Sequence, residues 1–499
     1  MKRCFLVLLA AIITVAAKAQ QWEINYGDAS SYTALSHGIV NDKGEAVFVG
    51  SSGTDKHHYY PIIMSVTVDG DFNSRVFDTL EGNLGPSHIL QLNNGNYVVS
   101  AVKSLDYSTL TGENVMFLVL DPDFNMVDVK SYELPEMVLG MANGSLMLDD
   151  DGTIIYSGGY LYQDVYGRRS KPCFYRFDEN GDLLSSRFVT ASYPHPEANI
   201  HLYECFQLLK NPVAEGFVTL CTGLNNMCSL LKYDYDFNYV DGFVLEPLLW
   251  DYFQNAYSDL WLSDNQLMVM GYMNSHDENA NWDIGLAEVD LDGTFGRWER
   301  VYYKQDTTIQ APTQCMAYVN DTTIYGAAFM YKNLGGTNYA AALLFDKDME
   351  VLGKKEFFDA EHRNQGSLSV LPLPDGSCLI NTEEFTLGDY SFGKFIKMHR
   401  EDFNPIPCGV KEVPKETITA LAFPNPAKDE LNIDISGLSE GRQHRIQITD
   451  ALGHICMSRI IRGDGNLLTV GVSSLKSGVY VYSIYNTEKE VIRNKFIKE

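Results

Sequence analysis

Two neighbouring stretches, "LNNGNYVVSAV" (residues 92–102) and "VMFLVLDPDFNMVDVKSY" (115–132), decide the fold. Their Val, Tyr and Phe residues favour a pleated, half-buried strand surface. The polar turns "NNG" and "DPD" supply residues that tolerate positive φ or bond to their own backbone. With the apolar segment before the first turn, these stretches predict four short antiparallel strands.

The same pattern recurs about seven times between residues 21 and 406. The first turns fall near residues 43, 95, 151, 213, 265, 321 and 375, a spacing of about 50 to 62 residues. Four such strands cannot bury both faces of their sheet, whereas copies stacked around an axis can. We therefore predict an all-β protein with a seven-bladed β-propeller. Six or eight blades remain alternatives, because the fourth copy is degenerate.

The two ends of this region predict how the ring closes. The seventh copy stops after its third strand, at "FIKMHRED" (395–402), and a lone strand-like piece, "QWEINYG" (21–27), precedes the first copy. If that piece is the fourth strand of the last blade, no sheet edge is left open. The region resembles secreted propellers of the delta-60 and kelch-like kind, a resemblance that implies a fold and no reaction.

The N-terminus has the composition of a secretory signal peptide. Residues 1–19 combine a basic start with an apolar core, and the small residues Ala17 and Ala19 precede Gln20. This pattern predicts cleavage between Ala19 and Gln20. No later stretch is long and apolar enough to predict a membrane span. The expected organisation is a signal peptide (1–19), a propeller (20–406), a linker rich in Pro, Lys, Glu and Thr (407–419) and an Ig-like β-sandwich (420–499).

Four motifs mark the C-terminal sandwich: "FPNPAKDELNI" (423–433), "ITDALGHIC" (448–456), "LKSGVYVYSIYN" (475–486) and "NKFIKE" (494–499). In this order they resemble the type A C-terminal sorting domain of the type IX secretion system, which bacteria of the Bacteroidota use. The matching positions are Pro424, Asn425, Pro426, Asp450, Gly453, Leu475, Gly478, Tyr480, Val481, Lys495, Phe496 and Lys498. The resemblance implies export through the periplasm by the type IX machinery. The cargo is then released or attached to surface lipopolysaccharide.

Charge and cysteine content limit the partners and the chemistry. The net charge is −27; residues 1–19 contribute +3 and residues 417–499 contribute +1, which leaves −31 on residues 20–416. Such an acidic surface repels phosphate backbones, so nucleic acid is not an expected partner. Eight cysteines remain after the predicted cleavage, without zinc-ligand spacing. "CTGLNNMC" predicts a disulfide between Cys221 and Cys228 across a hairpin, if the register allows it.

No catalytic or cofactor-binding motif occurs in the propeller region, so no cofactor or metal is expected. The loop "HDENANWD" (276–283) offers a weak ligand site, because Asp277, Glu278 and Asp283 beside Trp282 would suit a carbohydrate or a calcium ion. An exposed polar loop is the simpler interpretation. The acids of "LDDDG" (148–152) and "DLDG" (290–293) recur in register with the blades, which is typical of turns.

The leading hypothesis is a non-enzymatic binding module for an unknown extracellular glycan or protein. One alternative is a carbohydrate-active or other hydrolase, which predicts at least two carboxylates in the propeller funnel. A structural component of the surface layer is the other alternative.

Overall fold

The computed structural model describes residues 22–27, 31–55, 58–80, 83–104, 112–133, 140–164, 167–189, 205–212, 214–222, 228–244, 253–274, 282–302, 307–310, 316–318, 320, 322–332, 339–357, 364–385, 391–405, 422–435, 443–450, 455–462, 467–485 and 490–499. The chain divides into two compact units, Met1–Ile406 and Pro407–Glu499. The predicted signal peptide with its cleavage site and the predicted linker lie outside the described residues.

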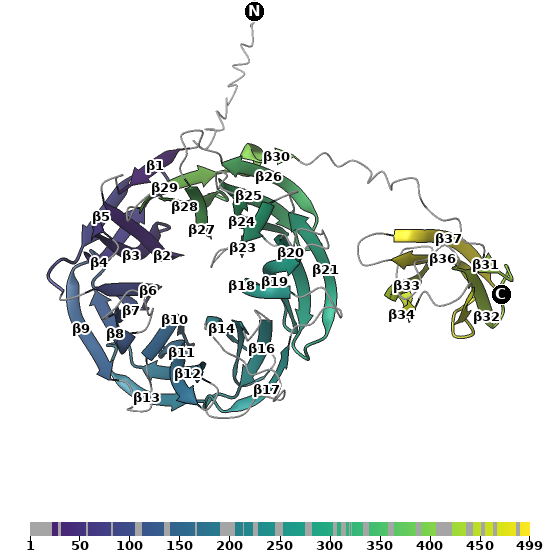
Figure 1. Ribbon diagram of the computed structural model, residues 1–499, viewed down its shortest axis with the longest axis horizontal. Coiled ribbons are helices and arrows are strands. Elements are labelled where there is room, and N and C mark those ends of the chain that lie inside the picture. Colours follow the sequence, from purple (N-terminus) through teal and green to yellow (C-terminus); the bar gives the residue numbers. More distant parts are fainter. Residues whose placement is uncertain are drawn as a thin grey trace, which may run out of the picture. The chain divides into compact units, whose positions relative to one another are not determined.

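The first unit is a ring of seven antiparallel blades, which confirms the predicted propeller (Figure 1). From the axis outward, blades 1 to 4 consist of β2 (Tyr32–Val40), β3 (Ala46–Asp55), β4 (His58–Val66) and β5 (Phe72–Val76); β6 (Leu84–Gln91), β7 (Tyr97–Ser104), β8 (Gly112–Leu120) and β9 (Met126–Glu133); β10 (Gly140–Leu148), β11 (Ile154–Asp164), β12 (Gly167–Phe177) and β13 (Leu183–Phe188); β14 (Cys205–Lys210), β15 (Phe217–Thr222), β16 (Cys228–Tyr233) and β17 (Tyr239–Val244).

Blades 5 to 7 follow the same order, with two departures. Their strands are β18 (Phe253–Ser263), β19 (Gln266–Asn274), β20 (Trp282–Asp290) and β21 (Phe295–Tyr302); the split inner strand β22 (Thr307–Gln310) and β23 (Met316–Tyr318), then β24 (Thr323–Lys332), β25 (Tyr339–Asp346) and β26 (Val351–Phe357); and β27 (Asn364–Pro372), β28 (Cys378–Phe385), β29 (Ser391–Met398) and β1 (Glu23–Tyr26).

The ring closes with strands from both ends of this unit. β1 pairs antiparallel with β29, Glu23 opposite Ile396, and so forms the outer strand of blade 7 as predicted. After β29 and a short 3₁₀ turn (Arg400–Asp402), the chain continues into β30 (Asn404–Pro405), which pairs with β26 of blade 6. The segment that follows blade 7 thus pairs with the outer strand of blade 6. β1 covers the edge of β29, and β30 covers the edge of β26.

Neighbouring blades bury their apolar faces against each other. Val47 and Ile63 of blade 1 pack in one cluster with Ile89, Val99 and Leu118 of blade 2, and none of them is more than 2% exposed. Each such side chain stabilises the fold by roughly 1.5 to 3 kcal/mol relative to exposure. A single blade exposes this surface, so the ring is the structure that the repeated pattern requires.

A five-residue turn recurs at the ends of the blade hairpins. In "DPDFN" (121–125), Asp121 Oδ1 accepts the backbone N–H groups of Asp123 and Asn125 at 2.9 and 2.8 Å. The fourth position has positive φ and is Gly181 in blade 3 but Phe124 in blade 2. A left-handed residue that is not glycine costs about 1 to 2 kcal/mol. The Phe124 ring is only 6% exposed, and its burial offsets that cost.

The second unit is a two-sheet sandwich. One sheet contains β31 (Ala422–Phe423), β32 (Glu430–Asp434) and β35 (Leu467–Gly471); the other contains β34 (Ile455–Arg462), β33 (Gln443–Asp450), β36 (Gly478–Tyr485) and β37 (Glu490–Lys498). Leu431, Ile433 and Val470 of the first sheet share a buried core with Ile448 and Tyr482 of the second. Both sheets thus bury one face against the other, as the alternating pattern predicted.

Candidate functional site

All seven innermost strands of the propeller are interrupted at one level. Six contain a β-bulge, between Leu35 and His37, Pro86 and His88, Ala142 and Ser145, Cys205 and Gln207, Gln254 and Ser258, and Ser367 and Ser369. In blade 6 the inner strand is divided into β22 and β23 at this level. A bulge leaves backbone groups without a ladder partner and re-aims side chains, so we treat this bulge belt as the candidate site.

The residue that follows the bulge is polar in all six bulged strands: His37, His88, Ser145, Gln207, Ser258 and Ser369. In blades 1 to 4 and 7 it lies four positions before the first residue of the inner hairpin turn. Because the innermost strands surround the axis (Figure 1), the repeat places these polar residues in one ring around it.

Two histidines of the bulge belt are in contact. The rings of His37 on β2 and His88 on β6 lie with centroids 4.2 Å apart. The backbone N–H of Ile89 donates to Nδ1 of His37 at 3.4 Å, which leaves the proton of a neutral His37 ring on Nε2. Burial, and then the neighbouring His88, hold the pKa of His37 well below its usual value. Burial lowers the pKa of His88 to about 4, so both rings are neutral at pH 7.

Unpartnered polar atoms occur next to this pair. Among the described residues, neither Nδ1 of His88 nor Oγ of Ser145 has a hydrogen-bond partner, although Ser145 is only 4% exposed. Their strands, β6 and β10, are neighbouring innermost strands of blades 2 and 3. Buried polar atoms are nearly always hydrogen-bonded, so these two atoms indicate a place for a ligand or a water molecule.

Carboxylates are scarce on the described innermost strands. Within the bounds given above, the innermost strands contain one acidic residue, Asp259. The acids of "LDDDG" and "DLDG" lie in hairpin turns; Oδ1 of Asp151 accepts the backbone N–H of Thr153 at 2.8 Å, and Asp292 does the same for Thr294. These described strands therefore contain no pair of carboxylates such as the hydrolase hypothesis predicts.

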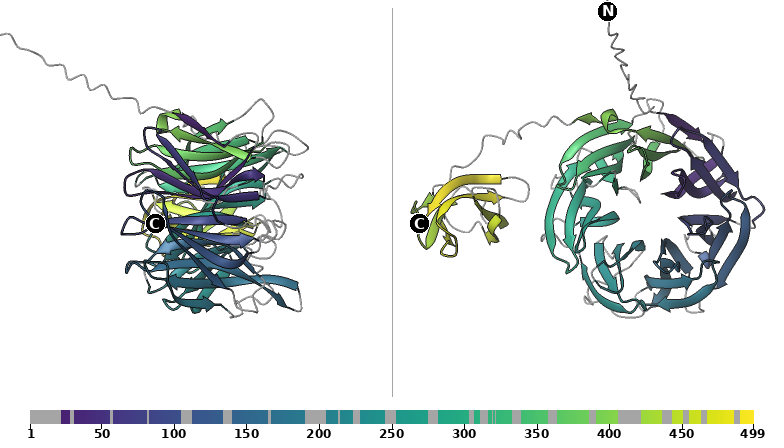
Figure 2. Two further views of the ribbon diagram at one scale, coloured as in Figure 1. Left: turned by 90° about the vertical axis from the view of Figure 1, so that its left-hand side faces the viewer. Right: turned by 180° about the vertical axis from the view of Figure 1, so that it is seen from behind.

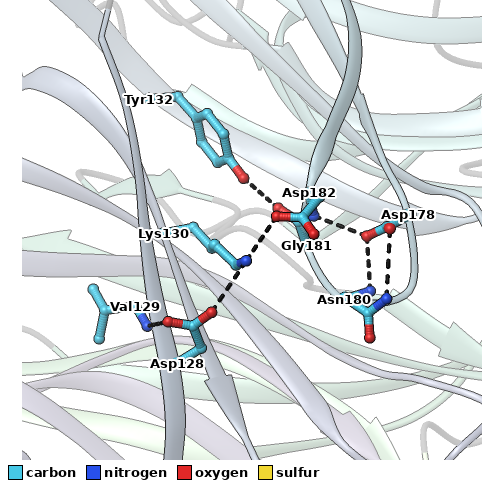
Figure 3. A network of polar contacts seen from close by, with 8 residues as sticks. All are labelled: Asp128, Val129, Lys130, Tyr132, Asp178, Asn180, Gly181 and Asp182. Atoms are coloured by element: carbon cyan, nitrogen blue, oxygen red, sulfur yellow. Dashed lines mark hydrogen bonds and ion pairs between the residues drawn. The ribbon is translucent and has the colours of Figure 1, made fainter.

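Other charged residues join blades at the rim (Figure 3). Nζ of Lys130 on β9 lies 2.7 Å from Oδ1 of Asp182, in the outer turn of blade 3, and 3.1 Å from Oδ2 of Asp128. The Asp178 carboxylate accepts the backbone N–H groups of Asn180 and Asp182 and so shapes that turn. Contacts of the same kind join Arg75 to Asn125, Arg187 to Asn238 and Arg297 to Asp348. Their recurrence between successive blades indicates a structural role.

The predicted ligand loop is only partly described. Asp277 and Glu278 lie outside the described residues, and Trp282 begins β20. Asp283 is buried, with 4% exposure, and its Oδ2 lies 3.3 Å from Nε of Arg300. Its carboxylate is therefore engaged in an ion pair inside the blade. A ligand role for this group of residues stays a prediction. Among the described residues, no three His, Cys, Asp or Glu side chains gather as a metal site.

The predicted pair Cys221 and Cys228 lies in the hairpin of β15 and β16. The register sets Cys221 opposite Ser229 and Cys228 opposite Thr222. The two cysteines are thus one position out of register across the hairpin, and their disulfide stays a prediction. Cys173, Cys378 and Cys456 are free thiols.

In the second unit, the first and last motifs are in contact. Oδ1 of Asn425 accepts the backbone N–H of Ile497 at 2.8 Å, and the backbone of Ala427 bonds to Ile497 and Glu499 at 2.7 and 3.0 Å. Pro424 and Pro426, both preceded by cis peptide bonds, flank Asn425. Residues 70 to 72 positions apart in the sequence thus form one corner of the sandwich.

The two middle motifs lie beside that corner. Tyr480 of β36 is opposite both Asp450 of β33 and Phe496 of β37. Its ring stacks on that of Phe496, with centroids 5.6 Å apart, and its hydroxyl donates to the Lys476 carbonyl at 2.9 Å. In the same register Gly478 is opposite Lys498, and Val481 is opposite Lys495. Leu475 packs against the sandwich core, and Gly453 lies outside the described residues.

The histidine pair was not among the sites predicted from the sequence. A signal was present, because "SH" occurs at residues 36–37 and again at 87–88, in the same place relative to the turn. Each copy alone looks like an ordinary strand residue. Only the register shows that a bulge precedes both histidines, so their meeting at the axis is a tertiary feature.

Comparison with solved structures supports the propeller. A polysaccharide lyase, the ulvan lyase of family PL25, superimposes with a TM-score of 0.50 and 9% identity over 74% of this chain and 95% of its own. The same lyase bound to -[GlcA(1-4)Rha3S]- gives a TM-score of 0.51 with the same identity and coverage. A protein of unknown function from Bacteroides caccae is 12% identical over 62% of this chain and 93% of its own, with a TM-score of 0.36. At these identities the lyase comparison shows the fold alone.

No curated protein matches the chain. The described residues form no helix of the length and apolarity needed to cross a membrane. Residues 421–499 match the family model described as the secretion system C-terminal sorting domain. The C-terminal sandwich is therefore the sorting domain of the type IX secretion system, and it directs this chain to the cell surface or into the medium.

Proposed function

We propose that the propeller is the exported working part of the chain, a non-enzymatic recognition module that binds a neutral glycan at the bulge belt. In this proposal the signal peptide takes the chain into the periplasm of a Bacteroidota-type bacterium, and the sorting domain then directs it outward. The bulge belt is the observation that supports binding, because a polar residue follows the bulge in six of the seven blades, and a bulge leaves backbone groups without a ladder partner.

The chemistry of the bulge belt suits sugar hydroxyl groups. Nδ1 of His88 and Oγ of Ser145 have no hydrogen-bond partner among the described residues, and the serines of the bulge belt supply short hydroxyls. Such groups both donate and accept, as hydroxyls do. The charge of −31 on residues 20–416 disfavours a polyanionic ligand. A neutral glycan therefore fits better than a sulfated or uronate-rich one.

A binding screen tests the proposal. Residues 20–499 are passed over an array of neutral and acidic glycans and extracellular matrix proteins, and every hit is checked for released product. We expect saturable binding to neutral glycans without product. Loss of at least about tenfold in affinity is expected for His88→Ala, since a buried hydrogen bond to a ligand is worth about 1.4 kcal/mol or more. Binding that is unchanged in His37→Ala and His88→Ala would remove the bulge belt from consideration.

The matched control is His58→Ala. His58 is an exposed histidine at the start of β4, opposite Asp55, and lies six β3 positions beyond the level of His37. At about 3.3 Å per residue this separates it from the bulge belt by roughly 20 Å. We expect unchanged binding in this variant.

Polysaccharide cleavage by a lyase is the second candidate. It is favoured by the fold shared with the ulvan lyase and by the neutral His88 ring, whose Nδ1 is available to take a proton. A base would remove the proton beside a uronate carboxyl, the bond to the leaving sugar oxygen would break, and that oxygen would be protonated. This candidate predicts an unsaturated product from acidic glycans in the same screen, whereas the recognition module releases none.

A further inference from the structure

Hydrogen bonds in both directions join the bulges of blades 1 and 2. Oγ of Ser36, the bulge residue of β2, donates to the Pro86 carbonyl on β6 at 2.8 Å. In return, the backbone N–H of Ile89 on β6 donates to Nδ1 of His37 on β2 at 3.4 Å. The two contact points on β6 lie on either side of His88 in the chain. Blade 1 thus holds the inner strand of blade 2 both before and after this histidine.

The second serine of the repeated "SH" pair is used differently. Ser87, the bulge residue of β6, shares a hydrogen bond of 2.8 Å with the Ser100 hydroxyl of its own blade. Ser36 also has an acceptor in its own blade, the Val49 carbonyl, but that contact is longer, at 3.1 Å, than the contact with Pro86. Of the two serines, Ser36 is the one that links neighbouring blades in the described part of the ring.

The acceptor of this link is rigid and close to the histidine pair. The proline ring fixes φ of Pro86, and only Ser87 separates it from His88, so a shift of Pro86 would move the backbone of His88. The His88 ring packs against the His37 ring, with centroids 4.2 Å apart. Burial lowers the pKa of His88 to about 4, which depends on keeping water away from this ring. Loosening of the link should therefore hydrate the ring of His88.

We propose that Ser36 is a positioning residue of the bulge belt, whose hydrogen bond to Pro86 holds the His88 ring in place for the ligand. Without the Ser36 hydroxyl, the Pro86 carbonyl loses this donor, and β6 can move relative to β2. Both the ring contact with His37 and the direction of Nδ1 of His88 would then change. The effect on ligand affinity rests on the function proposed above, whereas the effect on the His88 ring does not.

The His88 ring provides the first measurement. Residues 20–499, labelled with ¹³C at the histidine Cε1 atoms, are titrated with acid and followed by NMR. The chain has 11 histidines, and the signal that His88→Ala removes is the signal of His88. In the unmodified chain this signal should titrate near pH 4. Ser36→Ala should raise the midpoint by about one pH unit, toward the ordinary value of about 6.5, and Ser36→Thr, which keeps the hydroxyl, should restore it.

Affinity for a glycan found in the binding screen provides the second measurement. Ser36→Ala should weaken binding about fivefold, the worth of one ordinary hydrogen bond. The same substitution added to His88→Ala should cost nothing further, because Ser36 acts through His88. The matched control is Ser377→Ala, which removes a buried serine hydroxyl that donates to Asp375 in blade 7. It should lower the urea midpoint of unfolding and leave both the His88 signal and the affinity unchanged.

The two measurements separate the failure of this proposal from the failure of the proposed function. If no glycan binds to the unmodified chain, the proposed function fails, and the titration of His88 alone decides the role of Ser36. An unchanged His88 midpoint in Ser36→Ala would overturn the positioning role, whatever happens to the affinity. Additive losses of affinity in the double variant, or an equal His88 shift in the Ser377→Ala control, would overturn it as well.

Discussion

One buried cation, Lys397 of β29, lies at the seam where the ring closes. Its side chain is 4% exposed, and Nζ lies 2.7 Å from Oδ2 of Asp375 and 2.8 Å from the Val68 carbonyl. Asp375 belongs to blade 7 and Val68 to the outer turn of blade 1, so this ammonium group joins the last blade to the first. We predict that Lys397→Met destabilises the propeller by about 3 kcal/mol.

The magnitude follows from the partners that the substitution leaves behind. Removing one member of a buried ion pair costs about 3 to 5 kcal/mol. Because the Asp375 side chain is 26% exposed, water can partly solvate its carboxylate, and we expect the lower end of this range. The Val68 carbonyl adds little, because Nε1 of Trp22 also donates to it, at 3.1 Å. Methionine retains most of the apolar stem, so packing changes little.

Urea unfolding followed by tryptophan fluorescence measures the effect, since all five tryptophans precede residue 407 and report the propeller unit only. The control is Lys394→Met on the same strand. Its ion pair with Glu23 is longer, at 3.5 Å, and that glutamate is 51% exposed, so we expect a loss of about 0.5 kcal/mol or less. Equal effects of the two substitutions would refute the conclusion that Lys397 closes the ring.

Three further predictions concern other described contacts. Asn425→Ala removes the bond to the C-terminal strand and should reduce export to the medium, measured against periplasmic retention, whereas Asn432→Ala, which loses a 2.7 Å bond elsewhere in the sandwich, should not. Arg300→Met leaves the carboxylate of Asp283 buried without its ion-pair partner and should lower the free energy of unfolding, measured in urea, by about 2 to 3 kcal/mol. An unchanged free energy would contradict a structural role for this ion pair. Burial would raise the pKa of Asp375, but hydrogen bonds from lysine and serine outweigh it and lower that pKa. The contribution of the Asp375 carboxylate to the stability of the propeller is therefore present above about pH 4 and lost as the pH falls. Asp375→Asn should flatten the dependence of the unfolding free energy on pH between about pH 5 and 2.

Local patterns made much of the architecture predictable. The turn "DPDFN" shapes itself, because its first aspartate bonds to backbone groups two and four positions ahead. Alternating apolar residues then assign strands to the core without knowledge of their partners. The same holds for "QWEINYG", whose strand-like pattern and place before the first copy predicted the outer strand of blade 7, where β1 pairs with β29.

The candidate site was not predictable in this way. His37 and His88 are 51 positions apart, and their rings meet at 4.2 Å only because the two inner strands bulge at the same level. Asp283 looked like an exposed ligand residue, yet it follows the loop into β20, where Arg300 neutralises it. In the sandwich, Asn425 accepts a hydrogen bond from the backbone of Ile497, which lies 72 residues further along the chain.

The sequence by itself determined the strands, their number per copy and the sorting motifs, because period-two hydrophobicity, turn chemistry and a terminal address are all local in the chain. It left the blade count open between six, seven and eight, because the fourth copy is degenerate. The tertiary structure alone decided which residues meet: the two histidines of the bulge belt, and the buried Lys397 with its partners at the seam. The physical reason is register. Strand pairing sets the face and the level of every side chain, and a bulge of one residue reverses that assignment without leaving a local mark in the sequence.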